Sequence, residues 1–335
     1  MSHDVTGKVA ASPPARPGNR KSRRARMVPS ALLVGALGAV VPLTFATTPA
    51  GAATPTASGY TLVTSSGGVF GFGAAPNVGG AFGLADAPVV GIAPTATGKG
   101  YWVATADGGV FSFGDAKFLG SLGAIHLNSP IVGIVPTADG AGYYLVASDG
   151  GVFTFGDAQF FGSAGNLALA SPIVGISPTS TGNGYYLVGA DGGVFTYGDA
   201  VFAGTLSSTF SGPSPDGAAI GIAANPVGPG YLIATSQGAI VSYGGAPFFG
   251  SPVLSGVTPA QPLVSITYAP DGTGYWAAAA DGGIFTYDAS VTVGSGSTAS
   301  LSSTGTAHYF GSVPGEIGAS GLPIPTNVVG FAPTL

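Results

Sequence analysis

The fold is decided by one stretch, Tyr143-Tyr144-Leu145-Val146-Ala147-Ser148-Asp149-Gly150-Gly151-Val152-Phe153-Thr154-Phe155-Gly156-Asp157-Ala158, which recurs with variations along the chain. The copies begin at Tyr60, Tyr101, Tyr143, Tyr185, Tyr231 and Tyr275. They are spaced by 41 to 46 residues, and a period of that length is typical of a repeat architecture. The sequence therefore predicts a chain built from six copies of one structural unit.

Each copy predicts a β-hairpin. Residues 143–147 and 152–155 are short runs rich in aromatic and β-branched residues, which favour strands. The segment Asp149-Gly150-Gly151 between them supplies the positive φ that a tight turn needs. Apolar residues occupy successive positions in these runs rather than alternate ones, so we expect both faces of the strands to be covered.

Two more short segments complete the unit. Residues 160–163, Phe-Phe-Gly-Ser, and residues 172–176, Pro-Ile-Val-Gly-Ile, both have counterparts in most of the other copies. Four short strands joined by tight turns are typical of a propeller blade. Glycine within a strand marks close backbone approach, so we expect the strand at 172–176 to be the innermost one of its blade.

The two ends of the repeat region predict how it closes. The first copy begins at Tyr60 without a glycine-bearing strand, and the chain finishes on residues 328–333, Val-Val-Gly-Phe-Ala-Pro, which supply one. An open stack would instead need polar caps at both ends. We therefore expect an all-β fold over residues 54–335, a six-bladed β-propeller with four-stranded blades. One blade would join three N-terminal strands to one C-terminal strand.

Residues 1–53 are interpreted as a signal peptide with a long basic leader. Seven Lys and Arg residues precede an uncharged apolar run at residues 27–45, and Ala50-Gly51-Ala52 fits a small-residue cleavage site. Two alternatives stay open, namely twin-arginine export in place of the general route and an uncleaved leader kept as an anchor. We expect a secreted, extracellular protein, free or associated with the cell wall, with no stable membrane span after cleavage.

The charge after the leader excludes several partners. Lys99 and Lys117 are the only basic residues there, against thirteen acidic ones, and arginine is absent. Nucleic acids and anionic lipids need clusters of Lys or Arg, so neither is expected as a partner. The chain has no cysteine, and a closed ring of this length can be stable without disulfides. We expect a monomer.

The residues after the leader indicate no catalytic site. Propeller sialidases bind the substrate carboxylate with arginines, which are missing here. Glycosidases need paired carboxylates, whereas Glu316 is the only glutamate and most aspartates occupy repeated turns, where backbone preference explains them. A serine nucleophile would have only His126 or His308 as its base. No metal and no other cofactor is predicted, although a calcium ion held by aspartates is left open.

The repeats Tyr-Tyr-Leu-Val-Ala-Ser-Asp149-Gly-Gly-Val-Phe-Thr-Phe-Gly-Asp157-Ala and Pro-Ile-Val-Gly-Ile resemble those of secreted repeat proteins of actinobacteria. The resemblance covers about residues 59–335 and implies a module that stands alone or beside cell-wall hydrolases, in a family where most members have no assigned activity. Copy five departs from the pattern, because Ser236-Gln237-Gly238-Ala239 replaces the Asp-Gly-Gly turn. The hairpins are also similar to chromosome-condensation-regulator repeats, whose rings usually have seven blades and work inside cells.

A ligand site is predicted on the face that carries the Asp-Gly-Gly turns. Alternate connections of a blade open on opposite faces, so these turns share a face with the links that lead into the glycine-bearing strands. The links vary in length and residues, and varied loops on a common scaffold can encode specificity. The candidate ligand-binding residues are His126, Asn128, Asn166 and Asp216. Paired aromatics such as Tyr143-Tyr144 could stack on sugars, but core packing is favoured because both strand faces are covered.

The leading functional interpretation is a non-enzymatic binding or surface-display module of the bacterial cell envelope. Its ligand would be a glycan, another wall polymer or an extracellular protein. The alternative is an extracellular hydrolase that acts on carbohydrate or cell-wall material. Bound glycan would favour the first interpretation, whereas activity that is lost on changing His126 or Asp216 would favour the second.

Overall fold

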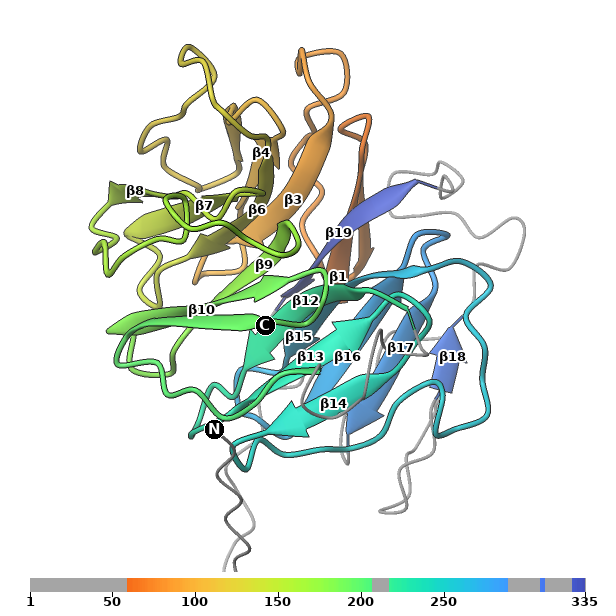
Figure 1. The fold of residues 1–335 in the computed structure, drawn as a ribbon. Coiled ribbons are helices and arrows are strands. Elements are labelled where there is room, and N and C mark those ends of the chain that lie inside the picture. The colour runs from red at the N-terminus through yellow and green to blue at the C-terminus, as the bar shows by residue number, and fades with distance from the viewer. Residues whose placement is uncertain (1–58, 207–216, 289–307, 311–326, 335) are drawn as a thin grey trace, which may run out of the picture. The chain divides into compact units, whose positions relative to one another are not determined.

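The computed structural model describes residues 59–206, 217–288, 308–310 and 327–334, which all lie in the compact unit Ala52–Leu335 (Figure 1). The predicted signal peptide and Asp216 lie outside these residues. The described elements are strands, arranged in six antiparallel sheets, which confirms the all-β prediction and is compatible with a β-propeller. In this part of the chain no helix is long and apolar enough to cross a membrane.

Each sheet has a middle strand with a hairpin partner on one side and an inner strand on the other. The middle strands are β1 (Gly59–Thr64), β4 (Tyr101–Thr105), β7 (Gly142–Ala147), β10 (Gly184–Gly189), β13 (Tyr231–Thr235) and β16 (Gly274–Ala279). The hairpin partners are β2 (Val69–Gly73), β5 (Val110–Phe113), β8 (Val152–Gly156), β11 (Val194–Gly198), β14 (Ile240–Tyr243) and β17 (Ile284–Asp288). The inner strands are β19 (Val328–Thr334), β3 (Val89–Pro94), β6 (Ile131–Pro136), β9 (Ile173–Pro178), β12 (Ala219–Ala224) and β15 (Leu263–Tyr268).

The hairpins form as the sequence predicts. In the third copy Tyr143 pairs with Phe155 and Val146 with Val152, and Gly150 in the turn has a φ of 84°. Every residue of β7 is buried, as is every residue of β4, β10, β13 and β16. Tyr143 and Tyr144 are 0% and 3% exposed, so both faces of the strand are covered. The preference for core packing over sugar stacking is confirmed for these aromatics.

The inner strands lie next to one another in the order β3, β6, β9, β12, β15 and β19, and β19 in turn lies next to β3. Neighbouring inner strands approach closely at two of the glycines that the sequence places in them. A Cβ atom on Gly175 would lie 3.2 Å from the Cα atom of Gly221, and one on Gly330 would lie 3.3 Å from the backbone nitrogen of Ile92. A side chain at either position would crowd the neighbouring strand, which confirms the predicted close approach for Gly175 and Gly330. On Gly91, Gly133 and Gly221 the nearest contacts of a Cβ atom would be ordinary ones of 3.4 Å or more.

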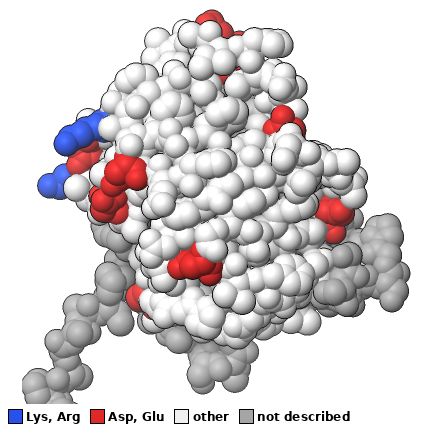
Figure 2. All heavy atoms as spheres, turned by 60° about the vertical axis from the view of Figure 1, so that its left-hand side comes forward, with Lys and Arg blue, Asp and Glu red and all other residues white. Residues whose placement is uncertain are grey.

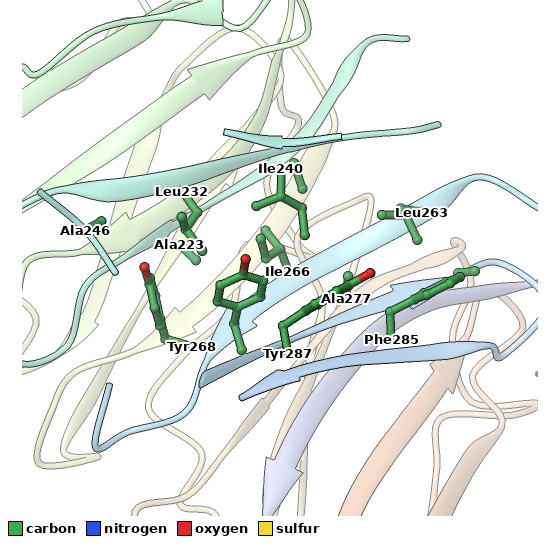
Figure 3. Close-up of a cluster of buried hydrophobic side chains, with 13 residues drawn as sticks. Ala223, Leu232, Ile240, Ala246, Leu263, Ile266, Tyr268, Ala277, Phe285 and Tyr287 are labelled. Carbon is green, nitrogen blue, oxygen red and sulfur yellow. The ribbon is translucent and has the colours of Figure 1, made fainter. Parts of the chain in front are cut away.

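Among the described residues the hydrophobic core forms six clusters, each shared by two consecutive sheets. Figure 3 shows the cluster between the β12–β14 and β15–β17 sheets, in which Leu232 and Ile240 meet Ile266 and Tyr287. The sheet that contains β16 also shares a cluster with the sheet of β1, β2 and β19. The last sheet along the chain therefore packs on the first.

The C-terminal strand β19 pairs with β1 of the N-terminal hairpin, as predicted. Thr61 lies opposite Ala332 in this pair, and the N–H of Val328 donates to the C=O of Ala280 in the preceding sheet at 3.0 Å. The composition of this sheet corrects one detail of the prediction. Within the described residues it contains two N-terminal strands rather than three.

The fourth strand predicted for every unit is the main correction. Five of the six sheets have three strands in the described part, and only the sheet of β15, β16 and β17 has a fourth, β18 (His308–Phe310). The Phe-Phe-Gly-Ser segment at residues 160–163 instead contacts the next sheet. There the Tyr185 hydroxyl donates to the C=O of Gly162 at 2.5 Å and accepts from its N–H at 3.1 Å.

We call this arrangement the tyrosine clasp, and it recurs along the chain. The equivalent hydroxyl-to-carbonyl bonds join Tyr101 to Gly79, Tyr143 to Gly120, Tyr231 to Gly204 and Tyr275 to Gly250. Gly162 has a φ of 138°, a conformation that a regular strand residue does not adopt. The segment is therefore held by a side chain of the neighbouring sheet rather than by the backbone of its own.

The clasp predicts that stability is lost at alkaline pH. Burial raises the pKa of the Tyr143, Tyr185 and Tyr275 hydroxyls above the ordinary value of 10.0. A raised pKa in the folded state gives stability that is complete below pH 10 and is lost as the pH rises through the folded-state pKa. We expect phenolate absorbance from these residues to appear together with loss of the β-sheet circular dichroism signal. Ionisation of the whole tyrosine set at pH 10 in a still-folded protein would contradict this.

Candidate binding site

The Asp-Gly-Gly turns hold their aspartates in a backbone role. The carboxylate of Asp149 accepts a hydrogen bond from the N–H of Gly151 at 2.9 Å. Equivalent bonds join Asp107 to Gly109, Asp191 to Gly193 and Asp281 to Gly283. An aspartate that bonds the backbone two residues onward stabilises the turn. This supports the structural interpretation of these carboxylates over a catalytic one.

The aspartates of the Gly-Asp-Ala motifs tie different connections together. Asp115 accepts hydrogen bonds from Thr95 at 2.9 Å and from Thr97. The bond from Thr97 is the largest cause that lowers the pKa of Asp115 below its usual value, and the bond from Thr95 adds to it. Equivalent bonds join Thr137 to Asp157 and Thr179 to Asp199. These carboxylates therefore fix the turns that lead from inner strands to middle strands.

The links into the inner strands lie against the Asp-Gly-Gly turns, so the shared face is as predicted. The N–H of Leu122 donates to the C=O of Gly108 at 2.8 Å, and Ala164 bonds Gly150 in the same way at 2.9 Å. The predicted ligand-binding residues His126, Asn128 and Asn166 are exposed on these links. None of the three lines the cavities described below, and their role stays a prediction.

A cavity of about 420 Å³ lies on this face at copy five. We call it the Gln237 cavity. It is lined by Ser236, Gln237, Val253, Gly256, Val257, Thr258, Pro259, Ala260, Gln261 and Pro262. Ser236 and Gln237 belong to the turn that replaces Asp-Gly-Gly, and the remaining residues belong to the following link. Gly238 beside them has a φ of 98°, so the turn keeps its backbone form while its side chains change.

The Gln237 cavity offers neutral hydrogen-bonding groups on an apolar wall. Each glutamine amide carries two donor hydrogens and an acceptor oxygen, and a hydroxyl such as that of Thr258 both donates and accepts. Val257 and Pro259 add apolar surface beside them. Sequence reasoning missed Gln237, Thr258 and Gln261 as site residues. The signal that could have found them is the loss of the Asp-Gly-Gly turn in copy five.

No protein-family model matches the chain, and no match was found among curated proteins.

Two further cavities lie along the inner strands. The axial cavity, of about 360 Å³, is lined by residues from all six inner strands. The proline mouth, of about 410 Å³, is lined by Pro94, Pro136, Pro178, Pro270 and Pro333 together with neighbouring threonines and Tyr144. The axial cavity and the proline mouth share Pro94, Pro136, Pro270 and Pro333 as lining residues. They are therefore adjoining spaces.

The charged side chains do not gather into one site. Figure 2 shows a mostly uncharged face on which acidic side chains lie singly or in small groups, with lysine atoms at one edge. In the described ranges no group of three or more His, Cys, Asp or Glu side chains is placed to hold a metal ion. The residues that line the Gln237 cavity are all uncharged.

Proposed function

We propose that the six sheets are the blades of a closed six-bladed β-propeller. The cyclic contacts of the inner strands and the cluster shared by the last and first sheets support this. So does the backbone bond from Val328 to Ala280, which joins the C-terminal strand to the sheet before it. The tyrosine clasps would act as rigid links between neighbouring blades. Such a ring is a stable platform whose connections can vary without loss of the fold.

We propose that this platform is a non-enzymatic binding or surface-display module of the bacterial cell envelope, exported by its leader and free of a membrane span once the leader is cleaved. The observation that carries the proposal is the Gln237 cavity, where Ser236 and Gln237 stand in place of an Asp-Gly-Gly turn and Thr258 and Gln261 of the following link add uncharged polar groups. The proposed ligand is a neutral glycan or wall polymer. We propose that the module works as a monomer and does not bind nucleic acid.

The chemistry of a glycan suits this cavity. Sugar hydroxyls both donate and accept hydrogen bonds, as do the side chains of Gln237, Gln261 and Thr258. The C–H face of a sugar ring is apolar and suits the surface of Val257 and Pro259. An anionic ligand would need lysines or arginines, and the basic side chains in the described part are Lys99 and Lys117, neither of which lines this cavity.

The hydrolase alternative has less support. The aspartates of the Asp-Gly-Gly turns and of the Gly-Asp-Ala motifs bond backbone amides or threonines, whereas glycoside hydrolysis needs two carboxylates that flank the bond to be cut. No carboxylate lines the Gln237 cavity. Asp216 lies outside the described residues, so its part in the alternative stays a prediction.

The test is binding to purified wall polymers and to soluble oligosaccharides derived from them. We expect Gln237→Ala and Gln261→Ala each to weaken binding by about tenfold, because each loses hydrogen bonds worth about 1 kcal/mol or more. Gln159→Ala is the matched control, since Gln159 is also exposed but does not line the cavity. Equal losses in Gln159→Ala and Gln237→Ala would refute the site. Release of soluble fragments from the polymer would favour the hydrolase instead.

A further inference from the structure

The axial cavity has a wall of apolar side chains that are only partly buried. Each of the six sheets has the same irregularity in the pairing of its inner strand with its middle strand. In the second sheet Val89 pairs with Thr105 and Gly91 with Ala104, so Val90 between them has no partner. A bulge of this kind can re-aim a side chain. An unpaired residue therefore recurs at the equivalent position of every inner strand.

The bulged residues are all β-branched and apolar, and all of them line the axial cavity: Val90, Val132, Val174, Ile220, Val264 and Val329. They are only half-buried, whereas Ile134 and Ile176, two residues further along their strands, are buried between sheets. Water finds no hydrogen-bond partner in these six side chains. Its displacement by an apolar group is favourable.

Polar side chains in the cavity wall are confined to one strand, β15. Ser265 replaces the inner-strand glycine in β15, and Thr267 follows it, and both line the cavity. The other five inner strands contribute glycine, alanine, proline and aliphatic side chains and one aromatic side chain, that of Phe331 in β19. The side chains that a ligand would meet in this space are therefore mainly apolar. Because the strands line the cavity along their length and most of the side chains there are aliphatic, an unbranched chain fits better than a flat polar ring.

The proline mouth is the entrance through which a hydrocarbon chain could reach the axial cavity, and its surroundings restrict the charge of the ligand's head group. Thr95, Thr137 and Thr179 line the mouth, and each bonds a carboxylate, Asp115, Asp157 or Asp199 respectively. Thr137 also bonds Asp139. Lys99 is close enough to Asp115 to favour its charged form, but carboxylates outnumber it. An anionic head group at the mouth would be repelled.

We propose that the axial cavity binds an unbranched hydrocarbon chain that enters through the proline mouth and carries a neutral or cationic head group. This goes beyond the proposed glycan site, because it uses a separate cavity and none of its residues. The same chain chemistry occurs in free fatty acids and in lipids with uncharged heads. The carboxylates around the mouth favour the second source.

The test is calorimetric titration of the intact protein with alkyl glycosides, alkyltrimethylammonium salts and alkyl sulfates of equal chain length, all below their micelle-forming concentrations. We expect one site, with affinity that rises about fourfold for each added CH₂ until the cavity is full and then levels off. We expect the sulfates to bind more weakly than the other two, with a difference that shrinks as salt is raised. Affinity that is absent, that appears only with micelles, or that is equal for sulfates and cations would overturn the proposal.

A double substitution in the cavity wall tests whether the hydrocarbon chain of the ligand binds in the axial cavity. The double variant Val132→Thr, Val174→Thr keeps side-chain shape but adds hydroxyls to the wall, and we expect at least about a tenfold loss of affinity. Val201→Thr is the matched control, because Val201 is 69% exposed and lies away from the cavity. Equal affinity in the double variant and the control would refute the site. If the double variant has a lowered melting temperature, the chain-length series on the intact protein still tests the proposal. Adsorption of the ligand to the protein surface would show no plateau of affinity with chain length.

Discussion

Removal of residues 327–335 is expected to abolish the cooperative melt of the intact protein. The deleted strand β19 buries Val328 and Phe331, which are 1% and 6% exposed. Loss of a buried Phe side chain alone costs about 3–5 kcal/mol, and the whole stability of a domain is only about 5–15 kcal/mol. The deletion also leaves one edge of β1 unpaired, because β19 pairs with β1 along its whole length. We expect no sheet region to remain folded at the melting temperature of the intact protein.

The loss spreads because β19 contacts two neighbouring sheets. The N–H of Val328 bonds the C=O of Ala280 in the sheet before it, and β19 lies next to β3 of the sheet after it. Both neighbouring sheets lose their contacts with β19. The strand edge that is left unpaired can then pair with another molecule and cause aggregation. Thermal unfolding followed by circular dichroism measures the effect. A synthetic peptide of residues 327–335, added in excess, should restore the melt of the truncated protein.

Two controls distinguish the loss of strand β19 from other effects of shortening the C-terminus. Removal of Thr334 and Leu335 alone keeps Val328, Phe331 and Ala332 in place and should change the melting temperature little. Phe331→Ala should give an intermediate loss, because the strand pairing with β1 is retained. A truncated protein that melts cooperatively at the temperature of the intact one would show that β19 does not complete the ring.

The sequence predicted the parts of the fold that are local. The hairpin turn depends on Asp149 and Gly150, which lie beside each other in the chain, and strands appear within one or two residues of the predicted positions. The pairing of β19 with β1 is not local, yet it was predictable, because the repeat lacks one strand at its start and has a spare one at its end. Repetition thus carried long-range information that a single copy does not hold.

The fourth strand could not be judged from its own residues. Phe160-Phe161-Gly162-Ser163 has the composition of a short strand, but its structure is decided by the hydroxyl of Tyr185, which is 23 residues away from Gly162 and in another sheet. The regular β-bulge at Val90 and its equivalents was missed for a similar reason. A bulge changes pairing without changing hydrophobic pattern, so the apolar run reads as an ordinary strand.

The sequence predicted the face on which the candidate site lies, but not the residues that form it. Turns and links of that face are adjacent because Leu122 bonds Gly108, which follows from blade topology. Which link forms a cavity depends on how residues 252–262 fold over the Gln237 turn, and nothing in the repeat specifies that link. His126 and Asn166 were predicted from their place on the variable links of that face, and both are exposed and line none of the three cavities.

Gly162→Ala is expected to cost about 3 kcal/mol or more, which would test the tyrosine clasp. A Cβ at this position would lie 2.5 Å from Cδ1 and 2.9 Å from Cε1 of the Tyr197 ring. The ring or the segment must move, and overpacking of this kind costs about 1–3 kcal/mol. Movement of the segment also breaks the bond of Gly162 to Tyr185, whose loss leaves buried groups unpaired at about 1–3 kcal/mol. A φ of 138° adds backbone strain for any side chain.

Gly182→Ala is the matched comparison, because Gly182 also has a positive φ, 72°, but a Cβ there would meet nothing within 4 Å. Its cost should be about 1–2 kcal/mol, from backbone strain alone. The double variant Gly162→Ala, Tyr197→Ala then isolates the contact with the ring. If the ring causes the loss, Gly162→Ala should be less damaging in the Tyr197→Ala background than in the intact protein, with a coupling of about 1 kcal/mol or more measured by chemical denaturation. Equal costs for Gly162→Ala and Gly182→Ala, with no coupling to Tyr197, would mean that the segment yields freely and that the clasp does not hold neighbouring sheets together.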